Sequence, residues 1–104
     1  MSGSILHQLD RIVRFDRAGP AKTVFFESEK LKAQVIGLEP GQRIPPCSMD
    51  HDVVFIVLEG EGEIIADAER LSVRPFSWVL VSKETGLRSI EAATKMTILA
   101  MQVR

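Results

Sequence analysis

The sequence has one cysteine, no tyrosine and only two histidines among its 104 residues. A single cysteine excludes an internal disulfide, so a reducing compartment such as the cytoplasm is the expected location. Without tyrosine, and with only His7 and His51, the chain has few groups suited to general acid–base catalysis near neutral pH. No apolar run reaches the roughly 20 residues that a membrane-spanning helix needs.

The chain also lacks an excess of charge of either sign. Thirteen basic residues face fourteen acidic ones, which gives a formal net charge of −1. This balance offers no electrostatic footprint for nucleic acid or an anionic membrane, so neither is expected as a partner. The first sixteen residues lack both a basic leader and an uninterrupted apolar stretch, so we do not expect a secretory signal.

What the sequence does contain is a series of strand-like segments after residue 20. These segments are rich in β-branched and aromatic residues and are separated by turn residues. They cover residues 22–28, 31–39, 52–59, 63–69, 76–82, 87–92 and 95–103. Pro40-Gly41 predicts a type II turn, and Gly60 and Gly62 predict a tight hairpin. The pattern indicates an all-β, antiparallel sandwich or barrel.

The N-terminal region has a different pattern. Apolar residues between Ile5 and Val13 follow helical spacing, but about ten residues form at most a short helix or an arm. We therefore expect an N-terminal arm over residues 1–20 and a single barrel domain over residues 21–104. A chain of this length is sufficient for one hydrophobic core.

Two predicted strands are apolar on both faces. Val53, Phe55 and Val57 share one face, and the residues between them are also apolar, as they are in residues 78–81. A strand with one face in water would alternate apolar and polar residues. Either the N-terminal arm or a second subunit is expected to cover the outer face, and a homodimer is the expected assembly.

The stretch PPCSMDHDVVFIVLEGEG, residues 45–62, resembles the first motif of the cupin superfamily, G-x5-H-x-H-x3-E-x6-G. Gly41, Cys47, Met49, Val53 and Gly60 occur at every spacing of that motif. The resemblance covers roughly residues 30–103. It implies an antiparallel double-stranded β-helix, or jelly-roll barrel, with a short N-terminal arm or helix. It also implies that the three ligand positions of the motif are occupied by Cys47, Met49 and Val53.

The second cupin motif, G-x5-P-x-G-x2-H-x3-N, matches only in spacing. With its first position at Phe76, its histidine falls on Leu87. The resemblance thus implies a ligand set of Cys47, Met49, Val53 and Leu87, in which valine and leucine cannot bind a metal. We therefore expect neither a metal nor another cofactor. His51 has the same strand parity as Cys47 and Met49, so a soft-metal site of these three residues is the alternative.

These residues predict a binding pocket without catalytic residues. We expect Cys47, Met49, Val53, Phe55 and Leu87 to line an apolar pocket, with His51 as its main polar contact. Trp78 is expected either in the pocket wall or in the core. The predicted function is metal-free binding of a small apolar or mixed-polarity molecule in the barrel. The alternatives are an isomerase- or epimerase-like cupin enzyme using His51 and Cys47, and a structural or protein-interaction module.

Overall fold

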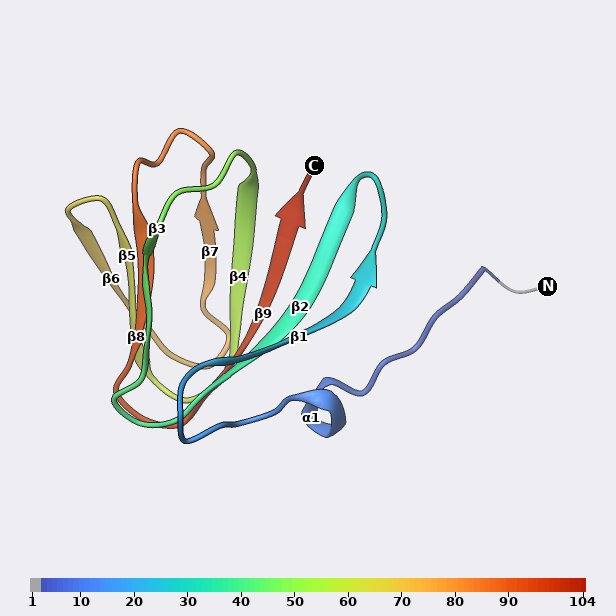
Figure 1. The fold of residues 1–104 in the computed structure, drawn as a ribbon, viewed down its shortest axis with the longest axis horizontal. Coiled ribbons are helices and arrows are strands. Elements are labelled where there is room, and N and C mark those ends of the chain that lie inside the picture. Colours follow the sequence, from blue (N-terminus) through green and yellow to red (C-terminus); the bar gives the residue numbers. More distant parts are fainter. Residues whose placement is uncertain (1–2) are drawn as a thin grey trace.

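The computed structural model describes residues 3–104, and its regular secondary structure is almost entirely antiparallel strand (Figure 1). One short helix, α1 (Leu9–Ile12), precedes the strands. The strands are β1 (Ala21–Glu27), β2 (Leu31–Leu38), β3 (Arg43–Cys47), β4 (Asp52–Glu59), β5 (Gly62–Ala66), β6 (Glu69–Val73), β7 (Trp78–Val81), β8 (Arg88–Ala92) and β9 (Met96–Val103). The predicted all-β class and antiparallel arrangement are confirmed.

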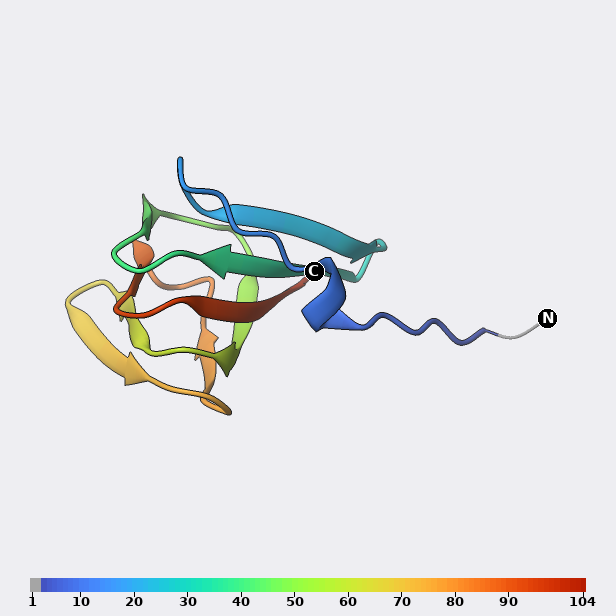
Figure 2. The ribbon, with the colours of Figure 1, turned by 90° about the horizontal axis from the view of Figure 1, so that it is seen from below.

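The strands form two sheets that face each other (Figures 1 and 2). The five-stranded sheet has the order β1-β2-β9-β4-β7, and the four-stranded sheet has the order β3-β8-β5-β6. From β2 to β5 each successive strand lies in the opposite sheet, and from β6 to β9 the chain alternates again. This alternation between two antiparallel sheets produces the double-stranded β-helix, or jelly roll.

The core lies between the two sheets. Along β4, Val53, Phe55 and Val57 are buried, whereas Leu58 is exposed and Val54 and Ile56 are partly buried. The strict alternation shows that the first three side chains point inward. The same buried cluster includes large side chains from both sheets, namely Ile36, Leu38, Ile64, Ile90 and Ile98.

The structure corrects the strand assignment in two places. β3 was not predicted, because its sequence Arg43-Ile-Pro-Pro-Cys47 contains two prolines. It pairs only with β8 and is shifted in register between Ile44 and Cys47, and such an edge strand tolerates proline. The segment 63–69, predicted as one strand, is instead most of β5, a turn, and the first residue of β6.

The predicted hairpin at Gly60 and Gly62 is also wrong. β4 pairs with β7 and β9, whereas β5 pairs with β6 and β8, so these glycines connect the two sheets. Gly60 has φ +85°, and a Cβ there would collide with the Lys95 carbonyl oxygen. Glycine is therefore required where the chain crosses from one sheet to the other. The predicted turn at Pro40-Gly41 is present, with φ +82° at Gly41.

Residues 3–8 form an extended arm that projects from the two sheets (Figures 1 and 2). The His7 ring contacts the Phe25 ring edge to face, with a centroid separation of 5.3 Å. The helix α1 has four residues and buries none of them. Within residues 3–104 no helix has the length and apolar character needed to cross a membrane.

Candidate functional site: a cavity between the two sheets

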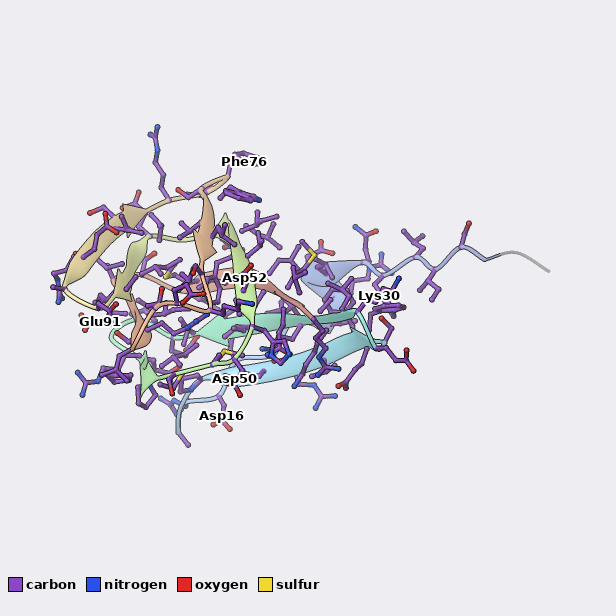
Figure 3. The ribbon with its side chains drawn as sticks, turned by 90° about the horizontal axis from the view of Figure 1, so that it is seen from above. Asp16, Lys30, Asp50, Asp52, Phe76 and Glu91 are labelled. Atoms are coloured by element: carbon purple, nitrogen blue, oxygen red, sulfur yellow. The ribbon has the colours of Figure 1, made fainter. Side chains whose placement is uncertain are left out.

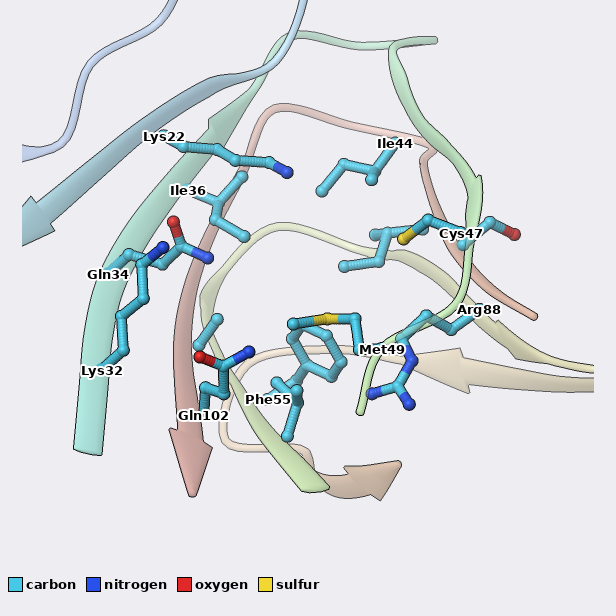
Figure 4. Close-up of a pocket in the computed structure, with 14 residues that line it drawn as sticks. Lys22, Lys32, Gln34, Ile36, Ile44, Cys47, Met49, Phe55, Arg88 and Gln102 are labelled. Carbon is cyan, nitrogen blue, oxygen red and sulfur yellow. The ribbon is translucent and has the colours of Figure 1, made fainter. Parts of the chain in front are cut away.

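The interior of the barrel contains a partly enclosed cavity between the two sheets (Figure 4). It is lined by Lys22, Lys32, Gln34, Ile36, Ile44, Cys47, Met49, Val53, Phe55, Arg88, Ser89, Ile90, Ala100 and Gln102. About 70 Å³ is open to the centres of water-sized molecules. One water needs about 10–15 Å³ by that measure, so the cavity can hold several waters or part of a small molecule.

The floor of the cavity is apolar because adjacent strands direct their buried faces toward it. Val53 and Phe55 come from β4, Ile36 from β2, Ala100 from β9 and Ile90 from β8. Phe55 and Ala100 are paired across β4 and β9, which places a large side chain beside a small one. The missing volume at Ala100 therefore helps to keep the space beside Phe55 open.

Polar side chains also line the walls of the cavity, and the charged ones all carry the same sign. Lys22 and Lys32 lie on β1 and β2, and Arg88 lies on β8 in the opposite sheet. Gln34 and Gln102 add amide groups on the lysine side (Figure 4). No aspartate or glutamate is among the lining residues of the described chain. The cavity thus combines an apolar floor with a positive electrostatic potential.

Arg88 is the most deeply buried of these charges, with only 4% of its surface exposed. Its Nη1 donates to the Val81 carbonyl oxygen at 3.4 Å, and its Nη2 donates to the Ser82 carbonyl oxygen at 3.1 Å. Its Nε has no hydrogen-bond partner. None of the ion pairs within residues 3–104 includes Arg88.

The structure brings four of the seven predicted site residues together. Cys47, Met49, Val53 and Phe55 all line the cavity. Cys47 ends β3 with its free thiol exposed at the cavity, and Met49 packs against the core from the loop that follows. Their roles in ligand binding stay predictions, but their convergence follows the spacing of the cupin motif.

His51 and Trp78 do not line the cavity, which corrects their predicted placement. His51 shares parity with Cys47 only if the strand is continuous, but β3 ends at Cys47 and β4 begins at Asp52. Trp78 pairs with Ile56, which faces away from the interior, and 60% of the Trp78 surface is exposed. Trp78 therefore belongs to the outer face of the five-stranded sheet, neither to the pocket wall nor to the core.

Leu87 is also outside the cavity lining, with 54% of its surface exposed. The next residue, Arg88, faces the cavity and pairs with Cys47 across β3 and β8. The spacing of the second motif therefore placed the cavity-facing position one residue too early, at Leu87 instead of Arg88. Because side chains alternate along a strand, that shift exchanges an exposed leucine for a buried arginine. Arg88 therefore lines the cavity at a position that the motif spacing did not indicate.

The cavity does not fit a metal ion of the cupin type. Of the residues at the motif positions, only the Cys47 thiol and the Met49 thioether can donate to a metal, and Val53 has no donor atom. The Arg88 guanidinium repels a cation from the same space. In the part of the chain that the structure describes, no three His, Cys, Asp or Glu residues are grouped as metal ligands.

Comparison with known proteins found no matching family model and no matching curated protein. Solved structures match closely. An RmlC-like cupin protein from Desulfovibrio desulfuricans is 26% identical, with 96% of each chain covered and a TM-score of 0.87. An uncharacterized conserved protein from Klebsiella pneumoniae with a double-stranded β-helix domain is 16% identical, with 96% of this chain and 90% of that chain covered and a TM-score of 0.88. A mutant salicylate 1,2-dioxygenase from Pseudoaminobacter salicylatoxidans, in complex with gentisate, is 17% identical, with 83% of this chain and 25% of that chain covered and a TM-score of 0.77.

Proposed function

Since this chain has the cupin fold, we propose that it is a binding protein that holds a small organic molecule inside its barrel. The observation that carries the proposal is the cavity itself, which is partly enclosed, has an apolar floor and has a few converging polar groups. Small-molecule sites in proteins usually have this combination. A barrel of this size can be filled by its own side chains, and here space remains beside Phe55 and Ala100.

Binding is better supported than catalysis because of the groups that line the cavity. A general acid–base reaction needs a donor and an acceptor of suitable pKa within reach of the substrate. Histidine, aspartate and glutamate are absent from the lining residues of the described chain. The Cys47 thiol has no histidine beside it in that lining to activate it as a nucleophile. The enzyme alternative therefore has no specific observation in its favour.

The single cysteine provides a direct test of occupancy. Cys47 is the only thiol in the chain and lines the cavity, so the rate of its alkylation by iodoacetamide reports on the space around it. We expect a bound fragment from a small-molecule library to slow this alkylation. At ten times its Kd the same fragment should stabilise the native state by about 1.4 kcal/mol. That stabilisation raises the Tm by roughly 5–10 °C in a domain of this length.

Two variants control the experiment. A Cys47→Ser, Ser48→Cys protein moves the thiol to a neighbouring position outside the cavity lining, where the fragment should not slow alkylation. Ala100→Leu fills the floor and should remove the protection while leaving the protein folded. If no fragment changes either the alkylation rate or the Tm of the unmodified chain, the binding function is wrong.

A further inference from the structure

The buried Arg88 side chain lacks a counter-charge. An arginine offers five N–H donors, and the two hydrogen bonds of Arg88 go to uncharged carbonyl oxygens. Its Nε, which is buried, has no acceptor. Burying a charge without a partner of opposite sign is costly. The guanidinium therefore lies beside an open cavity, and the protein alone gives it neither a counter-charge nor a full set of acceptors (Figure 4).

No nearby acidic residue supplies that counter-charge. Glu63 and Glu91 both pair with Arg70, and Glu27 pairs with Arg104. The Asp67 carboxylate accepts from the backbone N–H groups of residues 86 and 87. The Asp52 carboxylate accepts from the Lys83 N–H group. Each of these carboxylates has another partner, and none lines the cavity.

The wall opposite Arg88 also carries positive charge that an anion would balance. Lys22 and Lys32 line the cavity from β1 and β2, so positive charge lies on both sheets around the space (Figure 4). The whole chain has slightly more acidic than basic residues, so a basic chain does not explain this arrangement. An anion bound between the sheets would have cationic partners on both sides and apolar contacts from Phe55, Ile36 and Ile90.

We infer that the ligand is a small organic anion, a carboxylate on a short apolar body. Its carboxylate binds at the Arg88 guanidinium, which keeps N–H donors beyond the two that bond the Val81 and Ser82 carbonyl oxygens. Its apolar body lies on the floor formed by β2, β4 and β9. This inference rests on the proposed binding function and specifies its ligand class.

The test compares probes that share an apolar body and carry an anionic, a neutral or a cationic head group. The probes are butyrate, butyramide and propyltrimethylammonium, and their aromatic counterparts benzoate, benzamide and phenyltrimethylammonium. The readout is the alkylation rate of Cys47, which pairs with Arg88 across the strands. At ten times the Kd of the better carboxylate we expect a roughly tenfold slower rate. The amide and the cation at the same concentration should slow it less than twofold.

Variants of the charged residues test whether the preference for the carboxylate depends on Arg88. In Arg88→Met the carboxylate should lose its advantage over the amide, while Arg88→Lys should retain part of it because the charge remains. Lys83→Met removes an exposed cation outside the cavity lining and should leave the preference unchanged. If Arg88→Met does not fold, Lys32→Met provides the second test, with a smaller loss of the same sign.

The outcomes separate this inference from the function on which it rests. Protection by the carboxylates that is lost in Arg88→Met supports the inference. Equal protection by the amide, or stronger protection by the cation, overturns the anionic ligand and leaves small-molecule binding in place. If neither these probes nor any fragment protects Cys47, both proposals are wrong.

Discussion

At the scale of single residues, Arg88 has consequences for stability as well as for binding. Its guanidinium is buried, bears a full charge and has only backbone carbonyls as partners. The Ser82 carbonyl oxygen also accepts from the Thr85 N–H group at 3.0 Å, so it stays paired without Arg88. Replacing a buried ionic group by an apolar one of similar length is often neutral or stabilising.

We therefore expect Arg88→Met to keep the free energy of unfolding unchanged or raise it by up to about 2 kcal/mol in the absence of ligand. A truncation in the same core, Ile90→Ala, should lower it by about 2–5 kcal/mol. Urea denaturation followed by circular dichroism measures both changes. A loss of more than about 2 kcal/mol in Arg88→Met would show that the arginine is structurally satisfied and needs no anion.

The residues of the cavity could be predicted from the sequence only in part. Cys47, Met49, Val53 and Phe55 converge because the motif spacing fixes where β3 ends and β4 begins. Arg88 could not be recognised, because the turn before β8 has no sequence feature that fixes its length to one residue. Burial of a charged side chain also contradicts its usual preference for the surface, so composition gives no signal for it.

At the scale of elements, the turn between β6 and β7 is conformationally strained. Phe76 has φ +74° and 89% of its surface exposed, and it lies at the tip of this turn (Figure 3). The left-handed region costs a residue with a side chain about 1–2 kcal/mol. Glycine adopts such a φ without strain, so this turn has a backbone conformation suited to glycine while its side chain is aromatic.

We expect Phe76→Gly to raise the free energy of unfolding of the monomeric chain by about 0.5–1 kcal/mol. Relief of the left-handed strain exceeds the entropy that glycine adds to the unfolded state. Asp67→Gly is the matched control, since Asp67 also has a positive φ, of 53°, but its carboxylate accepts two backbone N–H groups. That variant should be less stable by about 1–2 kcal/mol. Urea denaturation of both variants tests the difference in sign.

Seven strands could be placed from apolar and β-branched runs, but two could not. β3 is a short edge strand whose prolines imitate a loop, and β6 (Glu69–Val73) is polar on its exposed face and joined to β5 by a two-residue turn. The glycine pair at 60 and 62 also fits a hairpin equally well. Which sheet a strand joins depends on contacts distant in sequence, which local patterns do not encode.

At the scale of the whole molecule, the outer face of the five-stranded sheet carries two apolar rows across β2, β9, β4 and β7. Strand register places Ala33, Met101, Val54 and Leu80 in one row, with Val35, Leu99, Ile56 and Trp78 in the next. An apolar groove runs between the N-terminal arm and the β1-β2-β9 part of this face. The β7 edge stays open, and Ile5 and Leu6 of the arm are themselves exposed.

We expect two copies to associate through these outer faces, because one chain carries both an open apolar face and an apolar arm that extends away from its own barrel. Light scattering at micromolar concentration should give twice the 11.6 kDa chain mass. Leu80→Glu, or removal of residues 1–8, should shift the mass toward the monomer. Leu87→Glu is the control, since Leu87 is similarly exposed but lies outside these rows. A monomer in the unmodified chain would contradict this assembly.

The most direct measurement of the central claim is a high-resolution crystallographic map of the barrel interior, obtained from crystals grown with benzoate or butyrate. We expect density for the probe in the cavity, with its carboxylate about 2.7–2.9 Å from the Arg88 nitrogens and its carbon atoms against Phe55 and Ala100. An interior closed by its own side chains, with Met49 filling the space beside Phe55 and no density for the probe, would contradict it.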